Sequence, residues 1–230
     1  MTPGGTGHWG RLLRAGAPMA LAVLTALHPA YSTDAGHEAA RIAADGMWLP
    51  LHLALLAAFA LYGISLLTWP TAGGRWWQAR RAGVVLSLVC YSAFLGVDGI
   101  AGGLLARASA SAPAGLRPGL DLGVTTLFSQ GVVGVLALLG AAGWVIATVA
   151  ITVESAADVR LLVPAAMLVA SGVLLGFSHD PPVGPLGAGL AVTAAVLADA
   201  TLYRRFRPLR ARAADQSAQD SPTGSAVDTA

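Results

Sequence analysis

The sequence has no lysine, a single cysteine and few charged residues of any kind. Charged side chains make up 11% of its 230 residues, against roughly 25% in soluble proteins. So few charges cannot cover the surface of a water-soluble globule, and hydrophobic residues account for 55% of the chain. The lone Cys90 excludes an intrachain disulfide. Composition therefore predicts a protein whose main solvent is lipid.

The positive charge is carried by arginine alone, and it is spread along the chain. All 14 cationic residues are arginines that lie at the ends of apolar runs. Nucleic-acid binding needs a concentrated basic patch that neutralises phosphates, so this class of partner is disfavoured. The sequence also lacks HExxH, a phosphate-cradling glycine loop and a complete nucleophile elbow. No catalytic residue is therefore assigned, and an enzyme is not the favoured interpretation.

Six stretches of the chain are apolar over a length that suits a membrane span. A spanning helix needs about 20 mostly apolar residues. Each stretch is apolar nearly all round, unlike an amphipathic surface helix. The stretches run over residues 14–34, 45–75, 81–107, 121–154, 160–179 and 180–204. The sequence predicts an all-α, polytopic membrane helix bundle of about six transmembrane helices, over residues 1–210.

The two ends of the chain have a different character. Residues 211–230 contain too little apolar surface to pack, so we predict a disordered cytoplasmic tail. The first stretch resembles a signal peptide in part, because basic residues precede an apolar core and small residues follow near Ala30. Cleavage there is the alternative, and it would leave five spans.

The distribution of arginines predicts the orientation. If the N-terminus is cytoplasmic, eleven arginines face the cytoplasm and three, Arg41, Arg107 and Arg117, lie outside. An excess of positive charge marks the cytoplasmic side. We therefore expect a multi-pass protein of the cell membrane, inner or plasma, with both termini in the cytoplasm.

Ionisable and polar residues gather toward the predicted outer face. His52, Asp98 and Gln130 lie in the outer parts of their spans, and His28 and His179 lie at the outer mouths of theirs. Polar groups inside a span are costly and usually have a reason. We predict that these five residues line a polar pocket that opens outward. Asp199, near the inner surface, is interpreted as an interfacial residue that reaches water or an arginine.

Several chemistries fit this set of residues. Asp98 and His52 lie on successive spans and are predicted to pair, either as structural glue between helices or around a proton or cation. A zinc or copper site would draw on His28, His52, His179 and Asp98 from four helices, because no HxxxH or cysteine pair is present. Haem would need two of the histidines to face each other.

The sequence favours a binding, sensing or transport-associated module whose immediate partner is the lipid bilayer. The alternative is a structural or assembly partner in a membrane complex or homo-oligomer. A membrane-embedded enzyme, or a metal or haem protein, ranks third. The ligand and any cofactor are not identified by the residues.

Overall fold

The computed structural model describes residues 8–29, 35–70, 74–129 and 131–219, and in these ranges the chain is helical with no strand. This confirms the predicted all-α class. The elements are α1 (His8–Ala26), α2 (Ala35–Ala44), α3 (Trp48–Leu67), α4 (Trp76–Leu95), the π-helix η1 (Gly96–Ala101), α5 (Gly102–Ser111), α6 (Arg117–Ser129), α7 (Gly131–Ser155), the 3-10 turn η2 (Val159–Leu161), α8 (Leu162–Phe177) and α9 (Val183–Gln219).

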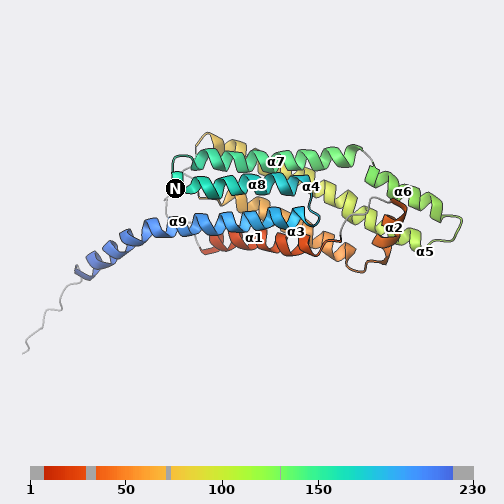
Figure 1. Ribbon diagram of the computed structural model, residues 1–230, viewed down its shortest axis with the longest axis horizontal. Helices are drawn as coiled ribbons and strands as arrows, with labels where there is room; N and C mark the ends of the chain where they lie inside the picture. The colour runs from red at the N-terminus through yellow and green to blue at the C-terminus, as the bar shows by residue number, and fades with distance from the viewer. Residues whose placement is uncertain (1–7, 30–34, 71–73, 130, 220–230) are drawn as a thin grey trace, which may run out of the picture.

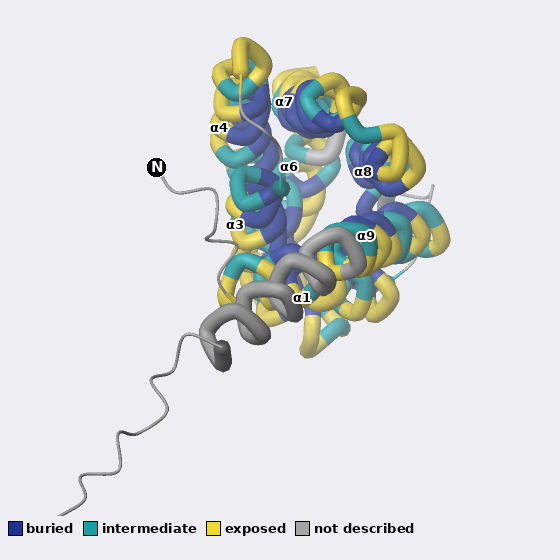
Figure 2. Tube along the Cα trace, turned by 90° about the vertical axis from the view of Figure 1, so that its left-hand side faces the viewer, coloured by how far each residue is buried: buried dark blue, intermediate teal, exposed yellow. Residues whose placement is uncertain are grey.

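The six longest helices pack side by side in a closed ring. Going round it, α1 packs on α3, α3 on α4, α4 on α7, α7 on α8, α8 on α9, and α9 returns to α1. Figure 2 shows this ring from one end, with buried positions turned toward its middle. Each helix thus has two neighbours, and the chain visits them in order except for the closing contact between α1 and α9.

In the described part of the chain, five helical segments are long and apolar enough to cross a membrane: 48–67, 76–111, 117–155, 159–177 and 183–203. They match five of the six predicted stretches. Helix α1 covers part of the first stretch but begins at His8 and ends at Ala26, and it is not among the five. Its first half carries Arg11 and Arg14, which reduce its apolar character.

Aromatic side chains fill the middle of the ring. The Trp144 ring lies 4.3 Å from Tyr91 and 5.0 Å from Phe59, centroid to centroid. Trp144, Tyr62 and Tyr91 are almost completely buried. Where α4 meets α7 the backbones themselves touch, because a Cβ at Gly83 would lie 2.6 Å from the Gly143 carbonyl oxygen. Small residues at such a crossing allow helices to approach closely where lipid replaces water.

Two helices extend past one end of the ring and carry a small cap. The continuous segment α4–η1–α5 has 36 residues, about 54 Å at 1.5 Å per residue. Its last helix, α5, packs with α6 and the short α2. These three helices form the cap, which lies opposite the end where α9 leaves the bundle (Figure 1). The cap has a separate core of Ala39, Ile42, Trp48, Ala106 and Val124.

The opposite end, which we call the arginine end, contains two buried ion pairs. Arg14 Nη2 lies 2.6 Å from Asp199 Oδ1, and Arg80 Nη1 lies 3.4 Å from Glu154 Oε2. The same arginines donate to consecutive carbonyl oxygens just past α3, Arg14 to Thr68 at 2.8 Å and Arg80 to Trp69 at 3.3 Å. Cations suit this position because the C-terminal end of a helix is electronegative.

Helix α9 continues well past the ring. It runs to Gln219, eight residues beyond the predicted start of the tail at residue 211, and projects away from the other helices (Figure 1). Ala, Arg, Leu and Gln, which are strong helix formers, are frequent in this stretch. Residues 220–230 lie outside the described residues, and the disordered tail remains a prediction.

Candidate functional site

Three histidines from three different segments meet at the end of the ring below the cap, which we call the histidine end. His28 follows the end of α1, His52 lies in the second turn of α3, and His179 lies between α8 and α9. Pro29 follows His28, and Pro181 and Pro182 follow His179. Proline cannot continue a helix, so the chain turns next to His28 and next to His179.

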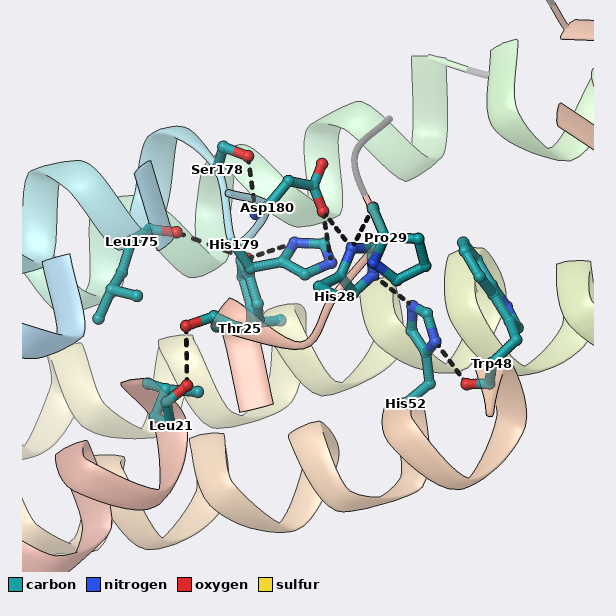
Figure 3. A network of polar contacts seen from close by, with 11 residues as sticks. Leu21, Thr25, His28, Pro29, Trp48, His52, Leu175, Ser178, His179 and Asp180 are labelled. Atoms are coloured by element: carbon teal, nitrogen blue, oxygen red, sulfur yellow. Dashed lines mark hydrogen bonds and ion pairs between the residues drawn. The ribbon is translucent and has the colours of Figure 1, made fainter. Parts of the chain in front are cut away.

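The three imidazoles lie within reach of a common point. One nitrogen of each ring lies within 4.8 Å of the others, and all three residues are buried. His28 Nε2 and His52 Nε2 are 3.3 Å apart. The rings meet edge to face, with centroids 5.0 Å apart for His28 and His52 and 4.9 Å for His28 and His179 (Figure 3).

Backbone carbonyl groups hold the Nδ1 atoms of two of these histidines. His52 Nδ1 lies 2.9 Å from the Trp48 carbonyl oxygen, and His28 Nδ1 lies 2.9 Å from the Pro29 carbonyl oxygen. A carbonyl oxygen can only accept, so each neutral ring carries its proton on Nδ1. When both rings are neutral in this way, the two Nε2 atoms that face each other both present lone pairs.

His179 has the same arrangement through a tyrosine. Tyr91 Oη lies 3.3 Å from His179 Nδ1 and 3.5 Å from the Leu175 carbonyl oxygen. When Tyr91 donates to that carbonyl, its oxygen accepts the proton of His179 Nδ1. His179 Nε2 is then an acceptor as well, and it is buried without a hydrogen-bond partner.

Asp180 supplies negative charge beside the cluster. Its Oδ1 lies 2.9 Å from His28 Nδ1 and 3.6 Å from His179 Nε2. Burial lowers the pKa of His179 to about 4, although Asp180 opposes this shift. Burial alone would raise the pKa of Asp180, but the neighbouring His28 and His179 more than offset it, so this pKa is lowered. At neutral pH, His179 is therefore neutral and Asp180 is ionised.

The π-helix η1 closes one side of the cluster. Its Gly99 lies directly on His52, because a Cβ there would come within 2 Å of the imidazole carbon Cδ2. The Gly99 carbonyl oxygen accepts a hydrogen bond of 2.7 Å from Trp48 Nε1. Single-turn π-bulges are frequent at functional sites. This one allows the backbone to pack on the ring of a buried histidine.

The structure brings together three of the five predicted pocket residues. Asp98, the fourth, lies on η1 and lines a cavity that His28 and His179 also line. The predicted pairing of Asp98 with His52 is less favoured, because the two ring nitrogens of His52 face Trp48 and His28. Gln130 lies outside the described residues.

That cavity has a volume of about 200 Å³ and lies against the histidine cluster. Its walls include Tyr91, Phe94, Asp98 and Asp180. Pockets for drug-sized ligands run from about 300 to 1,000 Å³. The cavity therefore suits a small ligand.

The geometry fits a metal ion better than it fits haem. Zinc–nitrogen bonds of about 2.0–2.1 Å in a tetrahedron place neighbouring nitrogens about 3.3 Å apart, which matches the His28–His52 separation. The remaining nitrogen separations, at most 4.8 Å, would have to shorten by up to about 1.5 Å. Haem would place its two axial nitrogens on opposite faces of a macrocycle, and the His28–His52 separation leaves no room for one.

Sequence reasoning did not single out Tyr91, Trp48 or Asp180 as members of the site. Asp180 directly follows a candidate histidine, which was a usable signal. Tyr91 and Trp48 gave none, since aromatic residues in apolar stretches are common. Asp199 contacts an arginine, Arg14, as one part of its prediction expected, while its position at the membrane interface stays a prediction. Comparison with known proteins adds no further evidence: no family model, no curated protein and no solved structure matches the chain.

Proposed function

We propose that this chain is a multi-pass membrane protein that binds one transition-metal ion, zinc or copper, between His28, His52 and His179. The observation that carries the proposal is that one nitrogen of each buried imidazole lies within 4.8 Å of the others, with His28 and His52 facing each other through Nε2 at 3.3 Å. The Nδ1 atoms of the three rings contact other groups. Metal-bound histidines commonly donate their second ring N–H to a carbonyl or carboxylate. Imidazole is a ligand that suits zinc and copper.

The proposed location is the outer surface of the cell membrane, with both termini cytoplasmic. The arginine bias supports this orientation, and the arginine end then faces the cytoplasm. Counting from Trp76, α4 rises about 30 Å by Leu95, the thickness of the hydrocarbon core. The π-helix and the histidine cluster then lie near the outer boundary, where a metal ion arrives from water.

The direct test is metal binding by purified protein that carries no histidine tag. After treatment with a chelator and dialysis, the protein should take up one equivalent of Zn²⁺, measured by calorimetry and elemental analysis. His28→Gln, His52→Gln and His179→Gln should each weaken uptake strongly. His8→Gln is the matched control, because His8 is exposed on α1, outside the cluster. Uptake that survives in all three cluster variants would overturn the proposal.

A single proton is the second candidate occupant. The His28–His52 contact at 3.3 Å could hold one proton between two lone pairs, as in a proton-binding or proton-transfer site. This alternative predicts no uptake of Zn²⁺ or Cu²⁺. It also predicts imidazole NMR signals of His28 and His52 that shift together with pH, and that the His52→Gln variant removes the shift of His28.

A further inference from the structure

The three histidines leave the proposed metal short of a fourth protein ligand. Tetrahedral structural zinc sites are closed by four protein ligands, whereas reactive sites use three and keep one position for an exchangeable ligand. Among the described residues, the histidine cluster is the group of metal-binding side chains that meets at one point, and it has three members. The acidic residue that contacts two of the three imidazoles is Asp180.

Asp180 is placed to orient His28 rather than to close the site. Its Oδ1 lies 2.9 Å from His28 Nδ1, whereas Nε2 of that ring faces His52. The same oxygen lies 3.6 Å from His179 Nε2, but Asp180 is not a member of the group that meets at one point. Figure 3 shows the carboxylate beside His28 and His179, away from His52. A carboxylate on the Nδ1 side is the usual outer partner of a metal-bound histidine.

The cavity gives the fourth position access to a ligand. His28 and His179 both form part of its wall. The rest of the wall combines the aromatic Tyr91 and Phe94 with the ionisable Arg41 and Asp98. A volume of about 200 Å³ is small by the standard of drug-sized pockets, but it is large enough for several water molecules.

Resting on the proposed metal site, we infer that the bound metal keeps one coordination position open to this cavity and takes there a small exchangeable oxygen- or nitrogen-donor ligand. Water, a carboxylate or a small anion from the outer side has the required size and donor atoms. The metal then binds a small molecule from the cavity. It differs from a closed structural site, in which protein ligands fill all coordination positions.

The experiment uses Co²⁺ in place of Zn²⁺, because its visible bands report coordination directly. The chelator-treated, untagged protein is loaded with Co²⁺ and then titrated with sodium azide and, separately, with sodium acetate. An open position predicts that the bands change saturably with azide. Ala137 lies on α7 and lines the cavity, so Ala137→Phe should fill part of it and weaken azide binding about tenfold or more with unchanged Co²⁺ stoichiometry. Leu138→Phe is the matched control, since the neighbouring Leu138 is 68% exposed.

Each result supports or overturns the open coordination position, and the last one also tests the metal site itself. Bands that respond to azide in the native protein, and respond less in Ala137→Phe than in Leu138→Phe, support the open position. Bound Co²⁺ whose bands ignore azide overturns this inference while the metal site stands. Azide sensitivity that appears only in Asp180→Asn also overturns it, because Asp180 is then the fourth ligand. Failure to bind Co²⁺, Zn²⁺ or Cu²⁺ overturns both.

Discussion

The two ends of the helix ring bury polar side chains in opposite ways. At the arginine end, each buried cation has an acidic partner, Arg14 with Asp199 and Arg80 with Glu154. At the histidine end, three imidazoles meet with one nitrogen of each within 4.8 Å of the others, and a single carboxylate, that of Asp180, lies beside two of them. Opposite charges that neutralise each other account for their own burial. Three neighbouring imidazoles do not neutralise each other in this way, and the proposed metal ion would account for their burial together.

The two ends differ in the partners that their buried polar groups have within the chain. The arginine end ties α1 to α9 and α4 to α7, and its guanidinium groups hold the end of α3. The histidine end joins the segment after α1, helix α3 and the turn before α9. Contacts of His28 with Asp180 and His52 already link these segments, and the proposed metal ion would add a further link. We therefore expect changes at the arginine end to affect stability, and changes at the histidine end to affect binding.

The largest effect is expected from Glu154→Ala. This change leaves Arg80 charged and buried without its partner, which costs about 3–5 kcal/mol of unfolding free energy. Denaturant unfolding in detergent, followed by tryptophan fluorescence, measures it. The double variant Arg80→Met with Glu154→Met should recover most of the loss, because it removes both charges. A loss below about 1 kcal/mol for Glu154→Ala would show that this ion pair does not stabilise the fold as its burial indicates.

The second effect is stabilisation by metal, and it should appear at the histidine end alone. An ion that binds only the folded protein adds about 2.7 kcal/mol at 100 times its Kd. Zn²⁺ should therefore raise the melting temperature of the native protein and of Glu154→Ala alike, and a chelator should reverse the rise. His52→Gln should abolish the rise. Stabilisation by Zn²⁺ that persists in His52→Gln would contradict the distinction between the two ends.

The third effect tests the more exposed of the two ion pairs. The Asp199 side chain is 20% exposed, whereas that of Glu154 is 2% exposed. Water can therefore partly solvate Arg14 when its partner is lost, so Asp199→Ala should cost about 1–3 kcal/mol, less than Glu154→Ala. Asp199→Asn keeps an acceptor near Arg14 and should cost less again. Thermal unfolding of both variants in one detergent gives the order, and the reverse order would contradict the burial argument.

Much of this fold follows from the sequence because its main signal, long apolar stretches, is strong. Five of the predicted spans match helices, and helices that alternate in direction place His28, His52 and His179 at one end. A helix that is apolar nearly all round has no polar face to show which side is buried. The partner of His52 was therefore predicted as Asp98, whereas the structure places His28 against it. For the same reason, the contact between Arg80 and Glu154 was not predicted.

The smallest effect on stability, and the sharpest test of the comparison, is expected from Tyr91→Phe. This change removes one hydroxyl whose contacts to His179 and Leu175 are 3.3 and 3.5 Å long, so the metal-free protein should lose less than about 1 kcal/mol. The ring stays in place against Trp144. His179, however, loses the hydroxyl that contacts its Nδ1. Removal of such an outer partner typically weakens metal binding by about 10- to 100-fold. Calorimetric titration of Zn²⁺ into native protein and Tyr91→Phe measures this change, and Tyr62→Phe, which removes a buried hydroxyl near Ser171, is the matched control. Equal Zn²⁺ affinities in the two tyrosine variants would mean that Tyr91 only packs, and that the histidine end is no more specialised than the arginine end.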